Sequence, residues 1–240
     1  MLQTWPVLIS RRHLVLGAAV TAFAGCSSRH ELGQPVNNPA DSVDPVDASA
    51  VLTQPNPEVA DVPKSVVLVG DSISAQSREA LQAVISDMGF NDVRIDAEPS
   101  RRIKMGKRNP TNGLDIVSFI HGAEPPGMWV IALGTNDAGL YTEDDEYQGL
   151  IDDMLGIIGD DLPLVWVNAY RDDHLDGCVQ FNELLRSTLE RRGNATVADW
   201  YQQCLAQSDD ILTDDGVHPN KNGILVFADT VRSAIASRLD

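Results

Sequence analysis

Three short motifs, spread along a chain of 240 residues, carry side chains that can do chemistry together. They are Gly70-Asp71-Ser72, Gly134-Thr135-Asn136-Asp137 and Asp215-Gly216-Val217-His218-Pro219. Between them they supply a serine, a histidine, carboxylates and a side-chain amide. Acyl transfer through a serine needs these groups as nucleophile, base, orienter of the base and donor to the developing oxyanion.

The serine and histidine motifs fit together as a proton relay. Asp215 can accept the Nδ1–H of His218, which leaves Nε2 free to take a proton from Ser72. Asp214 is the rival carboxylate. The structural alternative is that Ser72 belongs to an ordinary turn and helix cap, that Asp215 caps the final helix, and that His218 is a surface loop residue.

The middle motif supplies the amide. Asn136 can donate its NH₂ to an oxyanion, an interaction worth on the order of 3 kcal/mol in the transition state, or it can simply be part of a turn. We expect Asp137 to hold this loop through local hydrogen bonds rather than to act in chemistry.

The elements that position these motifs can be predicted from apolar patterns. Residues 66 to 69, 128 to 133, 164 to 167 and 195 to 198 are apolar runs of strand length, and residues 93 to 95 are a weaker fifth candidate. Such runs are typical of a parallel sheet covered on both faces. Helical spacing follows in four segments: residues 81 to 88, 147 to 158, 181 to 189 and 227 to 235. This alternation predicts an α/β protein, a three-layer α/β/α sandwich around a five-stranded, mainly parallel sheet.

The predicted sheet would bring the motifs to one edge. Ser72 follows the first strand, Asn136 the third, and His218 lies beyond the fifth. Loops at the carboxyl ends of parallel strands share the edge where ligands bind.

With these motifs in this order, the chain resembles the SGNH, or GDSL, hydrolase family over roughly residues 64 to 240. The resemblance implies that family's flavodoxin-like fold, with Ser72 as nucleophile, His218 as base and Asp215 as its orienter. It also implies that the N–H of Ser72 and the amide of Asn136 are oxyanion donors.

The family usually places a glycine after its second strand, which donates a further backbone N–H. The matching stretch here is Ile95-Asp96-Ala97-Glu98-Pro99-Ser100-Arg101, with Ser100 in the place of the glycine. This stretch is similar to the extracellular SGNH domains of peptidoglycan O-acetyltransferases. Because those domains work with a membrane acyltransferase segment, the resemblance implies that a separate membrane protein supplies acyl groups.

The first functional hypothesis is therefore a serine esterase that removes acyl groups, acetyl above all, from a carbohydrate or small ester. The second is an O-acyltransferase that uses the same chemistry on a cell-wall glycan. The third is a non-catalytic envelope-binding protein with an inactive hydrolase fold. Acyl chain length, glycan identity and the direction of transfer stay open at this point.

Other side chains offer weaker signals. Arg101 or Arg102 could contact a substrate and Trp200 could stack on a sugar ring, although solvated charge and aromatic packing are the favoured explanations of these residues. His121 and His174 lack partners at metal-ligand spacing, so we expect neither a metal nor an organic cofactor.

The cysteines separate into two groups. Small residues before Cys26 resemble a bacterial lipobox, which makes Cys26 a candidate for lipidation. Cys178 and Cys204 are an even pair, which either form a disulfide in an oxidising compartment or remain as two buried free thiols.

The N-terminal part of the chain is expected to direct export. Residues 1 to 25 contain the twin arginines Arg11 and Arg12 before a short apolar run, and they predict a cleaved signal peptide. The alternative is an ordinary secretory signal with an incidental cysteine. Residues 26 to 63 are rich in proline and lack Phe, Trp and Tyr, so they predict a disordered tether before a hydrolase domain over residues 64 to 240. The expected product is a bacterial lipoprotein on the outer side of the cytoplasmic membrane.

Composition narrows the partners. The chain has 43% hydrophobic residues, enough for one ordinary core, and a formal net charge of −17. Such an acidic chain is a poor partner for nucleic acid or for anionic lipid headgroups. Acylated carbohydrates and small neutral esters are easier to accommodate.

Overall fold

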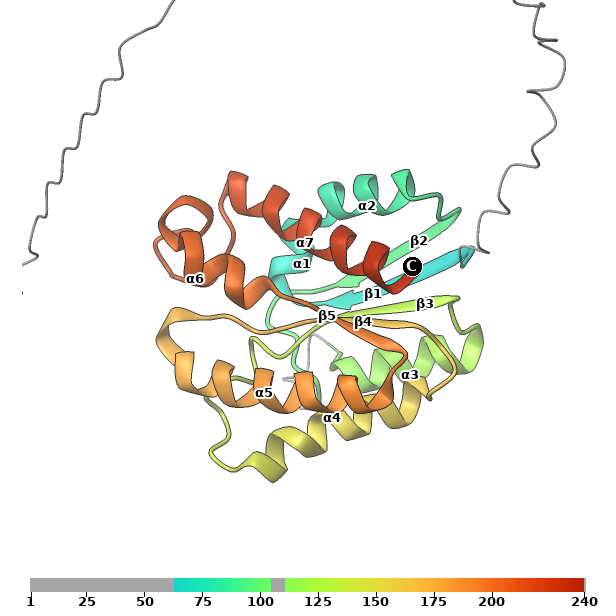
Figure 1. The fold of residues 1–240 in the computed structure, drawn as a ribbon, viewed down its shortest axis with the longest axis horizontal. Helices are drawn as coiled ribbons and strands as arrows, with labels where there is room; N and C mark the ends of the chain where they lie inside the picture. The colour runs from blue at the N-terminus through green and yellow to red at the C-terminus, as the bar shows by residue number, and fades with distance from the viewer. Residues whose placement is uncertain (1–62, 105–110, 240) are drawn as a thin grey trace, which may run out of the picture. The chain divides into compact units, whose positions relative to one another are not determined.

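A five-stranded parallel sheet forms the centre of the folded region (Figure 1). The computed structural model describes residues 63 to 104 and 111 to 239. The predicted signal peptide, most of the predicted tether and Cys26 lie outside the described residues.

All five predicted strands are present, and the sheet is entirely parallel. The strands are β1 (Ser65–Gly70), β2 (Asp92–Ala97), β3 (Met128–Ala132), β4 (Leu164–Val167) and β5 (Ala195–Ala198). Their order across the sheet is β2-β1-β3-β4-β5. The pairing of Val66 with Val93 on one side and with Met128 on the other fixes the register at the centre. The predicted architecture is therefore confirmed.

Helices cover both faces of the sheet, as Figure 1 shows. One layer contains α1 (Ser72–Gln76), α2 (Arg78–Asp87), α6 (Trp200–Ile211) and α7 (Lys221–Leu239). The other contains α3 (Gly113–Ala123), α4 (Asp144–Ile158) and α5 (Leu175–Arg192), and a 3₁₀ turn, η2 (Asp172–His174), precedes α5. No helix among the described residues is both long enough and apolar enough to cross a membrane.

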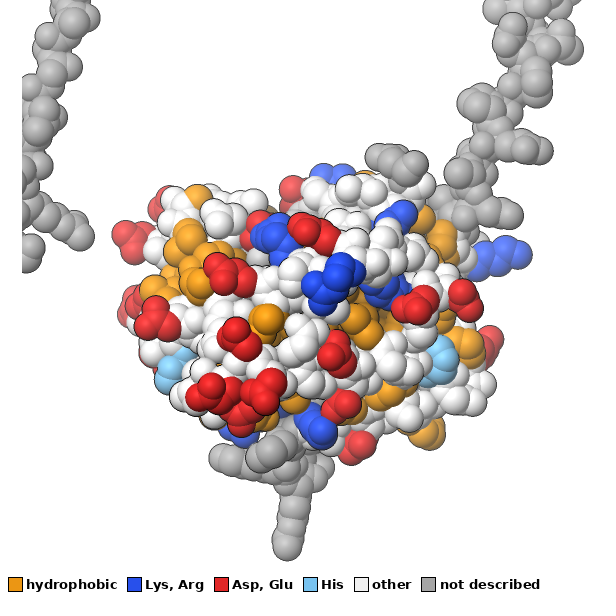
Figure 2. All heavy atoms as spheres, turned by 60° about the horizontal axis from the view of Figure 1, so that its bottom comes forward, with side chains coloured by type: hydrophobic (Ala, Val, Ile, Leu, Met, Phe, Trp, Pro, Cys, Tyr) orange, Lys and Arg blue, Asp and Glu red, His pale blue; other side chains and the backbone are white. Residues whose placement is uncertain are grey.

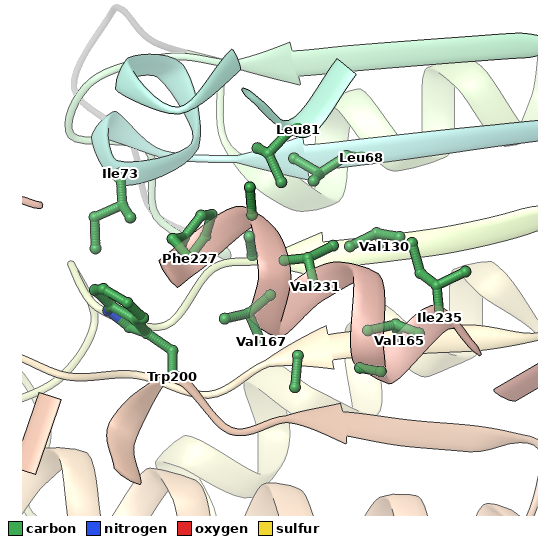
Figure 3. Packing of buried hydrophobic residues seen from close by; sticks show 14 of the residues in the cluster. Leu68, Ile73, Leu81, Val130, Val165, Val167, Trp200, Phe227, Val231 and Ile235 are labelled. Carbon is green, nitrogen blue, oxygen red and sulfur yellow. The ribbon is translucent and has the colours of Figure 1, made fainter. Parts of the chain in front are cut away.

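The apolar strands have this composition because each face of the sheet packs against a helix layer. In β1, Val66 and Leu68 belong to the core under α2 and α7, whereas Val67 and Val69 belong to the core under α3 and α4. Alternate residues of a strand point to opposite faces, so a strand buried on both sides must be apolar throughout. Figure 3 shows the first of these cores, in which Phe227, Val231 and Ile235 of α7 lie against strand residues.

Candidate active site

The serine of the first motif lies where β1 passes into α1. β1 ends at Gly70, Asp71 is the N-cap of α1, and Ser72 is its first residue. A Cβ on Gly70 would lie 2.3 Å from the Oγ of Ser74, so this turn has no room for a larger residue. Asp71 Oδ1 accepts a hydrogen bond from the N–H of Ile73 at 3.0 Å. The turn holds Ser72, half-buried, at the carboxyl edge of the sheet.

The third motif brings a histidine to this serine. Nε2 of His218 lies 2.9 Å from Ser72 Oγ, although the two residues are 146 positions apart in the chain. Nδ1 of His218 lies 2.7 Å from Asp215 Oδ2. An Nδ1–H that donates to Asp215 leaves the Nε2 lone pair facing the serine hydroxyl. Asp215, and not the exposed Asp214, is thus the carboxylate that contacts the imidazole.

The carboxylate of Asp215 is fixed by its own loop. Oδ1 accepts hydrogen bonds from the backbone N–H groups of Val217 and His218, each at 2.9 Å, and from the hydroxyl of Thr213 at 2.9 Å. Desolvation raises the pKa of Asp215, but these bonds and the imidazole contact outweigh it and hold the pKa well below its usual range. Asp215 therefore stays ionised beside His218 at neutral pH.

Gly216 gives this loop its tight bend, as the sequence predicts. Its φ is +67°, in the left-handed region that favours glycine. A Cβ at this position would also lie 2.6 Å from the Cβ of Asp172, whose backbone N–H donates to Gly216 O at 3.1 Å. The loop with Asp215 and His218 is therefore packed against the segment after β4.

The amide of Asn136 lies between the serine turn and the loop after β2. Its Nδ2 donates to Asp71 Oδ2 and to the backbone carbonyl of Arg101, both at 3.2 Å. A carboxamide nitrogen has two N–H groups, so both already have partners. Donation to an oxyanion requires one of these long bonds to be released or shared. Asn136 is next to the serine turn as predicted, and its role as an oxyanion donor stays a prediction.

Asp71 is a second carboxylate in this network, and the sequence alone indicated no role of its own for it. It is 2% exposed, and this burial raises its pKa to about 6. The bond from the Ile73 N–H and the charges of His218 and Arg101 lower the pKa in part. Asp71 is thus ionised at neutral pH and protonated in mildly acidic solution.

Ser100 lies in a turn formed by residues 98 to 101. Pro99 is second, Ser100 third with a φ of +64°, and the N–H of Arg101 donates to the carbonyl of Glu98 at 3.4 Å, which together indicate a type II turn. Ser100 is the one non-glycine residue with positive φ in the described parts of the chain. The N–H of Glu98 donates to Gly70 O at 3.2 Å, which fixes the turn beside the serine turn. The conformation suits the expected glycine position, and donation by the Ser100 N–H stays a prediction.

Arg101 is not available to a substrate. Its side chain is 1% exposed and donates to the carbonyls of Thr111, Gly70 and Asp96, and to the carboxylate of Asp96 at 2.9 Å. The predicted substrate contact is therefore wrong for this residue. The buried guanidinium connects the turn after β2 to the end of β1. This connection also places the Arg101 carbonyl within hydrogen-bond distance of Asn136.

Trp200 is likewise unable to stack on a sugar. It is the first residue of α6 and is fully buried, with its ring edge-on to Phe227 at a centroid distance of 5.2 Å. Figure 3 shows its ring inside the core with Phe227 and Ile73. The predicted substrate contact is wrong, because α6 directs this side chain into the core.

The side chain of Asp137 bonds to a more distant part of the chain than the sequence indicated. It is fully buried, and its two carboxylate oxygens lie 3.3 and 3.1 Å from the N–H of Ile103, 34 positions away. Burial raises the pKa of Asp137 to about 7, although the Ile103 bond and the charge of Arg102 lower it. The Asp137 carboxylate therefore anchors the segment after Ser100, whereas within its own turn the bonds are made by its backbone, whose N–H donates to Gly134 O at 3.0 Å.

The two cysteines of the domain are free. Cys178 and Cys204 are both buried and are not joined in a disulfide. They belong to different cores. Cys178 lies in the core under α3 and α4, and Cys204 lies in the core under α2 and α7. The disulfide prediction is wrong, and the alternative of two buried thiols is confirmed. Burial raises the pKa of the Cys178 thiol to about 11 and also raises the pKa of Cys204.

The two histidines outside the motifs have neighbours of their own. His121 stacks on Trp129 with ring centroids 6.4 Å apart, and His174 Nε2 lies 3.7 Å from Asp173. Within residues 63 to 104 and 111 to 239, no three His, Cys, Asp or Glu side chains are grouped so as to hold a metal ion.

Comparison with known proteins places this geometry among solved structures. No protein-family profile matches the sequence, and no curated protein matches it significantly. Among solved structures, the fold is similar to the C-terminal catalytic domain of peptidoglycan O-acetyltransferase A from Streptococcus pneumoniae, crystallised with a methylsulfonyl adduct. The TM-score is 0.58 at 20% identity, over 74% of this chain and 95% of that one.

Two further structures agree. A lipase/acylhydrolase from Enterococcus faecalis matches with a TM-score of 0.61 at 20% identity, over 74% of this chain and 97% of that one. A member of the lipolytic G-D-S-L family from Veillonella parvula matches with a TM-score of 0.57 at 16% identity, over 72% of this chain and 98% of that one. The chain has the SGNH hydrolase fold. Within this SGNH hydrolase fold, Ser72, His218 and Asp215 come together at the carboxyl edge of the sheet.

Proposed function

We propose that this chain is a serine esterase that hydrolyses acyl esters, acetyl esters in particular, of a carbohydrate or small molecule. The observation that carries the proposal is the continuous contact from Asp215 through His218 to Ser72, at 2.7 and 2.9 Å. The solved structures of similar fold support it, since they include a protein named as a lipase/acylhydrolase and another named as an esterase.

The proposed reaction runs through an acyl-serine. Ser72 Oγ attacks the ester carbonyl while His218 Nε2 takes the hydroxyl proton, and Asp215 stabilises the imidazolium that forms. The N–H groups of Ser72 and Ser100 and the amide of Asn136 are the proposed donors to the oxyanion. The intermediate collapses, and His218 returns the proton to the leaving alcohol. Water, deprotonated by His218, then attacks the acyl-Ser72 carbonyl. The bond from the acyl carbon to Ser72 Oγ breaks, His218 returns the proton to Oγ, and the carboxylic acid is released.

A second candidate function is O-acyl transfer, in which a glycan hydroxyl replaces water in the last step. One observation favours it: the fold is similar to a domain named as the catalytic part of a peptidoglycan O-acetyltransferase. In this case a separate membrane protein would deliver the acyl group. The third candidate, a non-catalytic envelope-binding protein, gives no reason for the aligned Asp215, His218 and Ser72.

The same proposal includes a place for the protein in the cell. We propose that residues 1 to 25 direct export, that Cys26 is lipidated, and that residues 26 to 63 tether the enzyme to the outer side of the cytoplasmic membrane. Intact-mass analysis of the protein from a bacterial membrane fraction tests this. A diacylglyceryl-modified chain beginning at Cys26 supports the proposal, and an unmodified N-terminus contradicts it.

The deciding experiment replaces the nucleophile. We expect Ser72→Ala to lower kcat for 4-nitrophenyl acetate at least about 10⁴-fold, because no acyl-enzyme can form. The melting temperature should change little, since Ser72 is half-buried and its Oγ bonds only to His218 among the described residues. Activity like that of wild type in this variant would eliminate both enzyme candidates.

The acyl acceptor separates esterase from transferase. Mass spectrometry of released acetate and of added muropeptide follows the fate of the acetyl group. Serine-dependent free acetate that does not respond to the glycan supports the esterase, whereas serine-dependent acetylation of the muropeptide supports the transferase.

A further inference from the structure

Arg102 is exceptional among the arginines of this protein. Every other arginine in the described parts of the chain donates at least one side-chain hydrogen bond to a carbonyl, a carboxylate or a hydroxyl. Arg102 donates no side-chain hydrogen bond to any described residue, and no described carboxylate lies within 4.0 Å of it. Residues 105 to 110 contain no Asp or Glu that could pair with it. Within residues 63 to 104 and 111 to 239, this cation therefore has neither a hydrogen-bond acceptor nor an ion-pair partner.

The backbone that carries Arg102 is fixed beside the catalytic groups. Its carbonyl accepts from the N–H of Gly113 at 2.8 Å, and the next residue, Ile103, donates its N–H to the buried Asp137. The preceding carbonyl, that of Arg101, accepts from Asn136 Nδ2 at 3.2 Å. Arg102 therefore directly follows the residue whose carbonyl contacts Asn136, the predicted oxyanion donor.

The other described cations near this edge already have acidic partners. Arg101 is paired with Asp96 in the interior. Arg171 donates to both carboxylate oxygens of Asp173, at 2.7 and 2.8 Å. Lys104, two positions after Arg102, bonds to Asp153 at 2.7 Å. Among the arginines that the structure describes at this edge, Arg102 alone has a half-buried guanidinium with no described partner.

The charges around the site make such a cation meaningful. Asp172 packs against Gly216 in the catalytic loop, and the exposed Asp214 lies within this loop. Figure 2 shows acidic side chains with some Lys and Arg among them over one face of the folded region, and the chain as a whole has a formal net charge of −17. A field of this sign repels anions, so an anionic substrate would need a local, desolvated cation for binding. The charge of Arg102 lowers the pKa of Asp137, but the two described side chains form no ion pair within 4.0 Å.

We propose that Arg102 is a substrate-binding residue that pairs with an anionic group, a carboxylate or a phosphate, on the ester that Ser72 attacks. A guanidinium suits this task because it donates two parallel hydrogen bonds to either anion. The proposal rests on the proposed function and deepens it, since it makes acidic carbohydrate esters the preferred substrate class. It also qualifies the expectation from net charge that substrates are neutral.

The test compares three esters that differ in charge. The probes are the 3-O-acetyl esters of methyl glucoside, methyl glucuronide and glucose 1-phosphate, which are neutral, carboxylated and phosphorylated. We expect kcat/KM to favour one or both anionic esters, and Arg102→Gln to remove about 10- to 100-fold of this preference. The neutral ester should change by less than about threefold. The anionic ester whose kcat/KM falls more in Arg102→Gln identifies the group, carboxylate or phosphate, that Arg102 binds.

Two variants serve as controls. Lys104→Gln removes the same charge two positions away, from a side chain that is already paired with Asp153, and should leave the preference in place. Arg102→Lys keeps the charge without the planar fork and should retain part of the preference. Equal losses on neutral and anionic esters in Arg102→Gln, or no preference in wild type, would overturn the proposal.

A binding measurement separates failure of this proposal from failure of the proposed function. Ser72→Ala shows whether turnover depends on the serine at all, and it does not alter Arg102. Titration calorimetry of the full chain with methyl glucuronide and with glucose 1-phosphate then tests Arg102 without turnover. Binding that Arg102→Gln weakens at least about tenfold, by loss of a charge-assisted hydrogen bond, supports the proposal even if no ester is cleaved. Binding that is absent, or the same in wild type and Arg102→Gln, contradicts it.

Discussion

At the scale of single residues, the serine, the histidine and its aspartate are already aligned, but the amide is occupied. Both N–H groups of Asn136 have partners, Asp71 and the carbonyl of Arg101, at 3.2 Å each. These distances are at the long end for an N–H donor. Hydrogen bonds of catalytic groups commonly tighten only when substrate is bound. Asn136 therefore has two separable roles, a structural one in the free protein and a proposed one in the transition state.

Truncation of Asn136 tells these roles apart. We expect Asn136→Ala to lower kcat by about 10²- to 10³-fold with little change in KM, because an oxyanion donor acts mainly in the transition state. The measurement is steady-state hydrolysis of 4-nitrophenyl acetate beside urea denaturation. Asn194→Ala is a matched control, since Asn194 also donates from Nδ2 to a backbone carbonyl, that of Asp161, but lies just before β5 at the opposite edge. A variant at Asn136 that loses stability while kcat stays unchanged would leave it only the structural role.

At the scale of elements, strands could be predicted better than the helices and the turns. Each of the five predicted strand segments became a strand, and in β1, β3 and β4 burial on both faces of the sheet demands continuous apolar sequence. Three helices, α1, α3 and α6, were not predicted. α1 has only five residues. α3 begins after residues 105 to 110 and has few polar positions, and in α6 only Trp200 was singled out, as a sugar contact or a packed aromatic.

Among the site residues, those in local motifs could be predicted, and those whose environment depends on distant parts of the chain could not. Ser72, Asp215 and His218 could be assigned because motif order and strand ends determine which loops meet. Arg101 and Trp200 could not, because burial of a guanidinium or an indole depends on partners far away in the sequence. Sequence patterns report local periodicity, whereas the carbonyls of Gly70 and Asp96 that receive Arg101 are brought together only by the sheet.

The turn of residues 98 to 101 allows a prediction at this scale. Ser100 adopts a φ of +64°, which costs a residue with a Cβ roughly 1 kcal/mol relative to glycine. We expect Ser100→Gly to raise the free energy of unfolding by up to about 1 kcal/mol and to keep kcat, because the backbone N–H is retained. Urea denaturation and hydrolysis of 4-nitrophenyl acetate check both parts.

Ser100→Ala completes this test. It keeps the Cβ and the N–H and removes only the hydroxyl, so stability and kcat should stay close to those of wild type. A large loss of kcat in Ser100→Ala would show that the hydroxyl, rather than the N–H, takes part in the reaction.

At the scale of the whole molecule, two buried carboxylates make stability depend on pH in an unusual direction. Burial raises the pKa of Asp71 to about 6 and that of Asp137 to about 7, from about 3.9 in an unfolded chain. Between these values the folded state binds more protons than the unfolded state. Their contribution is therefore fully present below pH 4 and is lost as pH rises through 6 and 7. The growing negative charge of the chain, −17 at pH 7, acts in the same direction.

We therefore expect the free energy of unfolding to fall as pH rises from 4.5 to 7.5, with a share on the order of 3 kcal/mol from each buried carboxylate. Urea denaturation across this range measures the slope.

Asp137→Asn should flatten this slope, because its side-chain oxygen can still accept the Ile103 N–H without titrating. Asp87→Asn, at an exposed position at the end of α2, removes a charge without removing a buried acid and should leave the slope almost unchanged. Salt at 0.5 M, a concentration of about three times physiological ionic strength, should weaken the contribution of net charge and leave that of the buried pair. A free energy of unfolding that rises with pH through this window would show that folding does not raise the pKa of Asp71 and Asp137.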